Sequence, residues 1–156
     1  MPPQLNHVSV SASDLDKAVG FYAELLGCSP IPAPNFGSPV RWMRIGDLQL
    51  HLFERPSAPG TYHHFGVAVP DFAEVCARAQ AMGVVDALTY GHHMFELPDG
   101  AVQLYVRDPS GNLVEIICPD AATLPAVLRG QARRLADQHP QEPDNLAASL
   151  FLEKCC

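Results

Sequence analysis

The sequence has little positive charge, no long apolar run and no paired cysteines, and each shortage excludes a class of protein. Lys and Arg together number 10 among 156 residues, against 17 Asp and Glu. The formal net charge of −7 excludes a nucleic-acid surface, which needs basic residues in excess. No apolar run approaches the roughly 20 residues of a membrane span. The N-terminus lacks the basic and apolar regions of a signal peptide, so we expect a cytoplasmic protein.

The cysteines do not form a recognisable pattern. They number five, an odd count without zinc-ribbon spacing. We expect reduced thiols, three of them in or near the core (Cys28, Cys76 and Cys118) and two on the C-terminal tail (Cys155 and Cys156). Nearly half of the residues are hydrophobic, at 47%, which is enough to form a proper core and makes disorder unexpected.

An internal repeat organises the chain. His7 and His64 lie 57 positions apart, and each begins a strand-like segment seven positions before an Asp that starts a helix. Capping residues and apolar spacing predict helices over 14–27 and 71–83.

Strand-like segments follow each helix. They are predicted over residues 40–45, 48–53, 85–97, 102–107 and 113–118, with a Pro-rich loop or short edge strand over 30–39. The sequence therefore predicts an α+β domain over 1–118, built from two βαβββ modules at about 4–54 and 61–118. Residues 119–156 stand outside the repeat, and we expect a helix from Ala121 to Gln138 followed by a tail.

Side chains alternate between the two faces of a strand, which separates polar from apolar positions. The face that carries His7 and His64 otherwise holds small residues, whereas valines and Phe65 fill the opposite face. His63 falls on the apolar face, which favours His64 as the functional residue. By the same alternation, Gln49 and His51 lie on the cavity side of their strand.

Glu115 interrupts the strongly apolar strand 113–118. A buried carboxylate costs several kcal/mol unless a cation pairs with it, and no Lys or Arg lies near it in the sequence. Two His and one carboxylate form the facial triad of non-haem Fe(II) oxygenases. The sequence therefore predicts a divalent metal at His7, His64 and Glu115, with Fe(II) expected and Mn, Zn, Ni or Co as alternatives.

A family resemblance extends over about residues 5–118. It is carried by four stretches: Leu5–Val10, Asp14–Gly27, His64–Asp71 and Asp108–Glu115. These stretches resemble the vicinal oxygen chelate superfamily, also called the glyoxalase/bleomycin resistance/dioxygenase superfamily. The resemblance implies two βαβββ modules that form a cupped mixed sheet around a metal site, the glyoxalase/bleomycin resistance/dihydroxybiphenyl dioxygenase fold. Homodimers are common in this family.

A finer match is similar to the signature of the type I extradiol ring-cleaving dioxygenases. Gly91-His92-His93 comes first, followed by Leu104-Tyr105 and Asp108-Pro109-Ser110-Gly111, and then Glu115. The spacer between His93 and Leu104 is a few residues longer than in that family. This resemblance implies Fe(II)-dependent cleavage of a small aromatic diol by O₂.

The same resemblance implies roles for individual residues. His51 would be the acid–base group, Tyr105 would hydrogen-bond a catecholate oxygen, and His93 would orient the substrate or bound oxygen. Gln49, His92 and Arg107 complete the expected substrate-binding set.

Other members of the superfamily supply the alternatives. One is a glyoxalase-like lyase, for which Gln49 is a candidate fourth metal ligand. A second is a thiol transferase similar to fosfomycin-resistance enzymes, which would need a basic anion pocket from Arg41, Arg44 or Arg107. A third is a metal-free drug-binding protein, which would not need the predicted triad.

Overall fold

The computed structural model describes residues 4–56 and 58–151, and these form two units. The first unit contains the chain up to Phe65 together with Arg107–Leu113, and the second contains Gly66–Val106 and the chain from Val114 onward. Cys155 and Cys156 lie outside the described residues.

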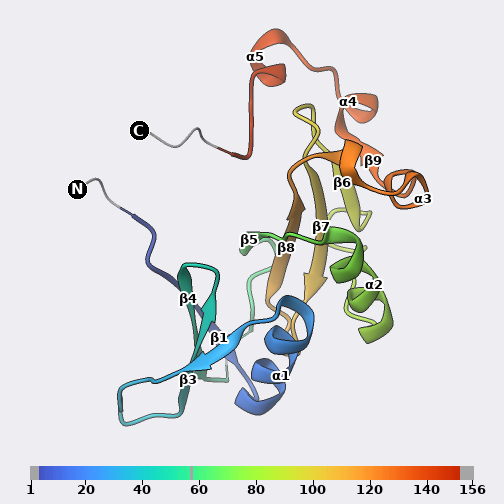
Figure 1. Ribbon diagram of the computed structural model, residues 1–156. Helices are drawn as coiled ribbons and strands as arrows, with labels where there is room; N and C mark the ends of the chain where they lie inside the picture. The colour runs from blue at the N-terminus through green and yellow to red at the C-terminus, as the bar shows by residue number, and fades with distance from the viewer. Residues whose placement is uncertain (1–3, 57, 152–156) are drawn as a thin grey trace. The chain divides into compact units, whose positions relative to one another are not determined.

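The first unit is a four-stranded sheet with one helix beside it (Figure 1). In spatial order, its strands are β1 (His7–Ala12), β4 (Leu48–Glu54), β3 (Val40–Ile45) and β2 (Ser29–Ile31). β1 runs parallel to β4, and the other neighbours are antiparallel. The expected edge strand within the Pro-rich region is the short strand β2.

Helix α1 (Leu15–Leu26) begins and ends where its capping residues predict. The Asp14 carboxylate accepts the backbone N–H of Lys17 at 3.0 Å, which satisfies one of the donors left open at the first turn. Gly27 ends the helix with a φ of 68°, a left-handed conformation that suits glycine. The apolar side of the helix is buried, with Tyr22 and Leu25 fully inaccessible to solvent.

A two-residue turn fixes which side chains face each other in this sheet. Ile45 pairs with Leu48, so Gly46 and Asp47 form the turn, and counting back from it places Trp42 opposite His51. On the other side of β4, the parallel pairing places His7 opposite Gln49. The predicted cavity-side residues of the first module therefore lie on one face of one sheet.

The second unit is organised around a five-stranded sheet. In spatial order, its strands are β5 (His64–Ala68), β8 (Leu113–Cys118), β7 (Val102–Arg107), β6 (Met94–Glu96) and β9 (Arg133–Arg134). The helix of this unit, α2 (Phe72–Met82), is capped by Asp71 and Gly83. Two sheets with helices confirm the predicted α+β class and the βαβββ order of both modules.

The long strand predicted over 85–97 is wrong for most of its length. Only Met94–Glu96 forms a strand, and Val85 makes an isolated bridge to Val106. The cause is Asp86, whose carboxylate accepts the backbone N–H groups of Leu88 and Thr89 at 2.9 Å each and so folds the chain into a turn.

The continuous helix predicted from Ala121 to Gln138 is also wrong. Short pieces replace it: η1 (Ala121–Thr123), α3 (Ala126–Arg129), β9 and α4 (Leu135–Gln138), followed by α5 (Pro143–Leu146). Pro125 precedes α3 and Gly130 ends it, as expected for residues that interrupt helices. β9 pairs with β6 and so extends the second sheet of its own chain (Figure 1). Among the described residues, no helix has the length and apolar character needed to cross a membrane.

Candidate functional site

The most ordered cluster of predicted site residues is a stack of three rings in the first unit. The imidazole of His51 lies between the indole of Trp42 and the imidazole of His7. The centre of its ring lies 4.0 Å from the ring centre of Trp42, with 4° between the two planes. It lies 4.3 Å from the ring centre of His7, with 18° between the planes. Only 7% of His51 is exposed. The stack confines the ring of the predicted acid–base residue beside a predicted metal ligand.

Gln49 determines which nitrogen of His51 can accept a proton. Its side-chain oxygen lies 2.9 Å from Nε2 of His51, and an amide oxygen can only accept, so Nε2 donates. Nδ1 is then the basic nitrogen of the neutral ring. Burial, and secondarily the charge of His7, lower the pKa of His51, which favours the neutral ring.

Both predicted histidine ligands are oriented by neighbouring oxygen atoms. Nδ1 of His64 donates to the backbone carbonyl of Tyr62 at 2.8 Å, and Nδ1 of His7 donates to the side-chain oxygen of Asn6 at 3.1 Å. In each neutral ring the lone pair is then on Nε2. Metal-binding histidines commonly show this arrangement, in which the second nitrogen is held by an oxygen acceptor.

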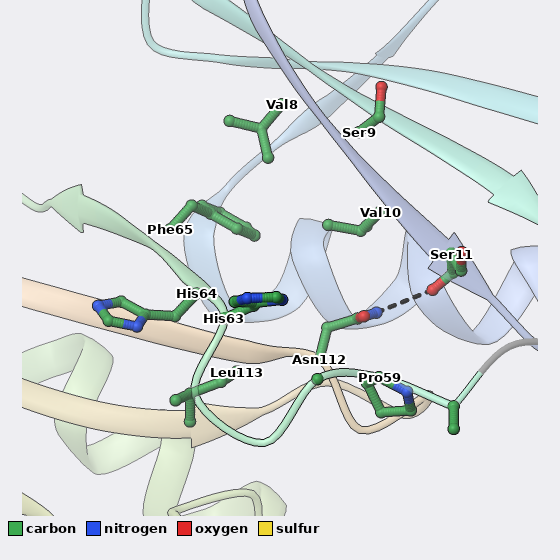
Figure 2. Close-up of a pocket in the computed structure, with 12 residues that line it drawn as sticks. Val8, Ser9, Val10, Ser11, Pro59, His63, His64, Phe65, Asn112 and Leu113 are labelled. Atoms are coloured by element: carbon green, nitrogen blue, oxygen red, sulfur yellow. Dashed lines mark hydrogen bonds between the residues drawn. The ribbon is translucent and has the colours of Figure 1, made fainter.

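A hollow of about 300 Å³ lies in the first unit beside β1 and the start of β5. Figure 2 shows the rings of His63 and His64 pointing in different directions at its wall, as expected for consecutive residues. Asn112 closes another side, where its side-chain amide donates to the carbonyl of Ser11 at 2.8 Å (Figure 2). The hollow is lined by Val8, Ser9, Val10, Ser11, Ala58, Pro59, Gly60, His63, His64, Phe65, Asn112 and Leu113.

The second unit holds Glu115 against Tyr105. The hydroxyl of Tyr105 donates to Oε2 of Glu115 at 2.9 Å, and both residues are buried, at 6% and 4% exposed. Burial, and then the negative charge of Glu115, raise the pKa of Tyr105, so its hydroxyl keeps its proton as a donor. The sequence predicts Tyr105 as a substrate contact, and in this unit its hydroxyl orients the predicted carboxylate ligand.

Gly66 lies beside the other oxygen of Glu115. A Cβ at Gly66 would lie 3.6 Å from Oε1 of Glu115, an ordinary contact, and 3.0 Å from the tip of Ile117, which would have to move. His64 lies two positions before Gly66 on β5 and therefore shares its face of the strand. The small residue predicted on this face therefore lies against the predicted carboxylate ligand.

The side chains of the remaining predicted residues make other contacts, although the backbone carbonyl of His93 accepts the N–H of Tyr105 at 2.9 Å. In the second unit, the rings of His92 and His93 are 4.5 Å apart, and Nε2 of His92 donates to the carbonyl of Gln131 at 2.8 Å. Burial, and secondarily the charge of His92, lower the pKa of His93. In the first unit, Arg107 donates to the carbonyls of Gly111 and Thr61. Arg107 therefore links two loops of the first unit through these hydrogen bonds.

The three predicted metal ligands are divided between the units, with His7 and His64 in the first and Glu115 in the second. Neither unit, over its described residues, gathers three His, Cys, Asp or Glu side chains by itself. The three-residue metal site therefore stays a prediction. The chemistry of the donor set fits such a group, because it consists of two imidazoles whose Nδ1 atoms are held by oxygen atoms and one buried carboxylate.

Sequence reasoning missed Trp42, although a usable signal was present. Gly46-Asp47 between two strand-like runs predicts a two-residue hairpin turn. Counting back from this turn places Trp42 opposite His51, as the structure has it.

A sequence model of the Glyoxalase/Bleomycin resistance protein/Dioxygenase superfamily matches residues 4–116. The match includes both modules and all the predicted ligands. The chain belongs to this superfamily.

Curated relatives of the chain come from bacteria, plants and mammals. An uncharacterised protein of Pseudomonas aeruginosa is 32% identical over 124 residues, covering 74% of this chain and 88% of the relative. A protein named glyoxylase I 4 of Arabidopsis thaliana is 29% identical over 136 residues, covering 79% of this chain and 75% of the relative.

Solved structures share the fold. An enzyme named oxidase ChaP-H2 is 26% identical with a TM-score of 0.60, covering 75% of this chain and 94% of that one. A variant of the fosfomycin resistance protein FosX of Listeria monocytogenes, complexed with Mn(II) and a dihydroxypropylphosphonic acid, is 20% identical with a TM-score of 0.63. That alignment covers 74% of this chain and 92% of FosX, and it shows likeness of fold.

Proposed function

We propose that the chain is a metal-dependent enzyme that cleaves the ring of a small aromatic diol with O₂, next to the diol. The observation that carries this proposal is the position of His51. Its buried imidazole stacks on the predicted ligand His7 at 4.3 Å, and Gln49 fixes its tautomer. A proton acceptor held beside a ligand suits a substrate that must lose a hydroxyl proton in order to chelate. The oxidase named among the solved structures adds a precedent for oxidative chemistry on this fold.

Three residues would hold the metal, namely His7, His64 and Glu115. Two imidazoles and a carboxylate suit Fe(II), which we propose as the native ion, and also Mn, Zn, Ni or Co. When bound, the metal would supply positive charge to both oxygens of a chelating diol and, as Fe(II), electrons for the reaction with O₂. The Mn(II) complex of FosX is a precedent for a divalent ion in a protein of this fold.

The other residues act on protons and orientation. Nδ1 of His51 accepts the proton of a diol hydroxyl and can return it to the product. Tyr105 donates to Oε2 of Glu115 and so would orient the carboxylate that would hold the metal. In the proposal, His93 orients the substrate, with His92, Arg107 and Gln49 as further contacts. The neutral ring of His93 can both donate and accept a hydrogen bond.

A glyoxalase-like lyase is the second candidate, and the relative named glyoxylase I 4 favours it. In that case the side-chain oxygen of Gln49 would serve as a fourth metal ligand. In the first unit this oxygen instead accepts the hydrogen bond of His51 at 2.9 Å. That contact favours the acid–base arrangement over the lyase arrangement.

The test is anaerobic reconstitution with Fe(II), followed by addition of a panel of catechols in the presence of O₂. We expect O₂ consumption together with a yellow ring-opened product. No turnover across the panel with either Fe(II) or Mn(II) would refute the ring-cleaving function. The parallel assay offers methylglyoxal and glutathione to protein loaded with Ni(II) or Zn(II), and turnover there would select the lyase.

His63 provides a matched control for the metal site. His63 and His64 are consecutive and point in different directions (Figure 2). We expect His64→Ala to abolish turnover and weaken metal binding at least tenfold, whereas His63→Ala should retain both. Tight metal binding that survives His7→Ala combined with His64→Ala would refute the ligand assignment.

We further propose that the enzyme is a homodimer, on the family resemblance. Its molecular mass in solution, measured by light scattering, tests the dimer.

A further inference from the structure

Stacking, rather than polar contacts, holds the indole of Trp42 in the first unit. Its Nε1 atom is buried and makes no hydrogen bond within the described part of the chain. One face of the ring lies flat on His51, with 4.0 Å between ring centres and 4° between planes. The ring centre of Phe36 lies 6.1 Å from that of the indole, with 43° between the two planes. The position of Trp42 is therefore set by its shape against His51.

The plane of His51 needs such a support. Gln49 holds one ring nitrogen, but a single hydrogen bond leaves the ring able to rotate about that contact. Two flat neighbours, Trp42 and His7, remove this freedom. The three rings belong to the adjacent strands β3, β4 and β1, so the register of the sheet keeps them together.

We infer that Trp42 is a positioning residue of the site, and that it acts through His51 on the metal ligand His7. The indole fixes the plane of His51, and His51 in turn supports one face of His7. Ligands that are already oriented bind a metal more tightly than ligands that must be ordered on binding. This inference rests on the proposed function, because it assumes that His7 binds the metal.

Trp42 is the sole tryptophan of the chain, so its emission reports on the stack without interference. Co(II) is a suitable probe, since a paramagnetic ion held by His7 would quench the emission of an indole in the same ring stack. We expect saturable quenching of the emission, with the same midpoint and the same one-to-one stoichiometry as Co(II) binding measured by calorimetry. His7→Ala should remove both signals.

Substitutions of Trp42 then separate positioning from general packing. Trp42→Leu removes the flat face and should weaken Co(II) binding about tenfold, with an unchanged far-UV circular dichroism spectrum. Trp42→Phe restores a flat ring and should bring the affinity back to within about threefold of the original. Phe36→Leu removes the tilted neighbour on the indole and should leave Co(II) affinity unchanged.

The outcomes separate this inference from the proposed function. If the original protein binds no Co(II) in calorimetry, the metal site is refuted, and the role of Trp42 is refuted with it. If the original protein binds Co(II) and a folded Trp42→Leu variant binds it equally well, the positioning role alone is refuted. Should Trp42→Leu unfold, Trp42→Phe decides: restored affinity with saturable binding supports positioning, and a tenfold loss refutes it.

Discussion

At the residue scale, the hydroxyl of Tyr105 donates a hydrogen bond directly to the predicted carboxylate ligand, Glu115. Glu115 is 4% exposed, and its Oε2 accepts this hydroxyl at 2.9 Å. A buried carboxylate needs donors or cations to offset the loss of hydration. Tyr105 supplies one donor, and its raised pKa means that the proton stays on the phenol as the pH rises through the neutral range.

Tyr105→Phe tests this contact. Loss of a hydrogen bond to a buried charged group should lower the free energy of unfolding by about 2 kcal/mol. It should also weaken metal binding about tenfold, as is typical when a neighbour that orients a ligand is removed. Chemical denaturation and calorimetric metal titration measure the two effects.

Tyr90→Phe is the matched control for this substitution. Its ring centre lies 4.7 Å from that of Tyr105, so the variant removes a hydroxyl from an adjacent ring and leaves the contact with Glu115 in place. We expect Tyr90→Phe to retain metal affinity. Equal affinities in Tyr105→Phe and the original protein would show that the hydroxyl does not orient the carboxylate.

At the element scale, the turn between β7 and β8 contains a buried carboxylate, Asp108, that also accepts a hydrogen bond from helix α1. Asp108 is 4% exposed and accepts four hydrogen bonds. Oδ1 accepts the backbone N–H groups of Ser110 and Asn112, and Oδ2 accepts the Asn112 amide and the Tyr22 hydroxyl. The motif that carries the family resemblance thus joins the turn to helix α1 within the first unit.

Asp108→Asn should be costly for this reason. The amide nitrogen of Asn cannot accept a hydrogen bond, so the donors at one of the two oxygen positions lose their acceptor. These donors are the Tyr22 hydroxyl and the Asn112 amide at Oδ2, or the backbone N–H groups of Ser110 and Asn112 at Oδ1. We expect the free energy of unfolding to fall by about 3 kcal/mol. Urea denaturation followed by circular dichroism measures it.

Asp99 supplies the comparison for Asp108. It also accepts backbone N–H groups in a turn, those of Ala101 and Leu150, but it is exposed. Water can replace the lost acceptor there, so Asp99→Asn should change the free energy of unfolding by less than about 1 kcal/mol. A similar loss in both variants would mean that burial of Asp108 does not matter.

Local signals explain which elements could be predicted from the sequence. Helix α1 lies within one residue of its prediction, because Asp14 and Gly27 act on the backbone beside them. The composition of the segment from Val85 predicted a strand. Instead, the carboxylate of Asp86 accepts the backbone N–H groups of Leu88 and Thr89 and so forms a turn. Strand alternation placed Gln49 and His51 on one face, whereas their mutual hydrogen bond depends on side-chain rotamers that no sequence pattern specifies.

At the scale of the whole molecule, the predicted metal site would take its residues from both modules of the repeat. The first supplies His7 and His51, which the structure places in ring contact, and the second supplies Glu115 with its donor Tyr105. The repeat predicts matched positions for His7 and His64 because both modules start with the same strand and helix. A property of the chain as a whole, the state of its cysteines, can be tested without assuming any ligand.

The cysteines that the structure describes are free thiols, and all three are buried: Cys28, Cys76 and Cys118. Burial raises the pKa of Cys28 to about 11 and also raises the pKa of Cys76. Since the thiolate is the reactive form, only about 0.1% of Cys28 would be ionised at pH 8. Cys118 donates its thiol proton to the carbonyl of Asp120 at 3.3 Å. The core thiols should therefore be chemically inert in the folded protein.

Alkylation with iodoacetamide at pH 8, followed by peptide mapping, tests this expectation. A Cys155→Ser, Cys156→Ser variant removes the two tail thiols, and in it we expect negligible labelling over an hour in buffer and complete labelling in denaturant. Labelling should accelerate as the pH rises toward 11, because the raised pKa means that the thiolate of Cys28 forms only there. Rapid labelling of Cys28 at pH 8 without denaturant would show that its thiol is accessible and ionised, and that the core of the first unit opens readily.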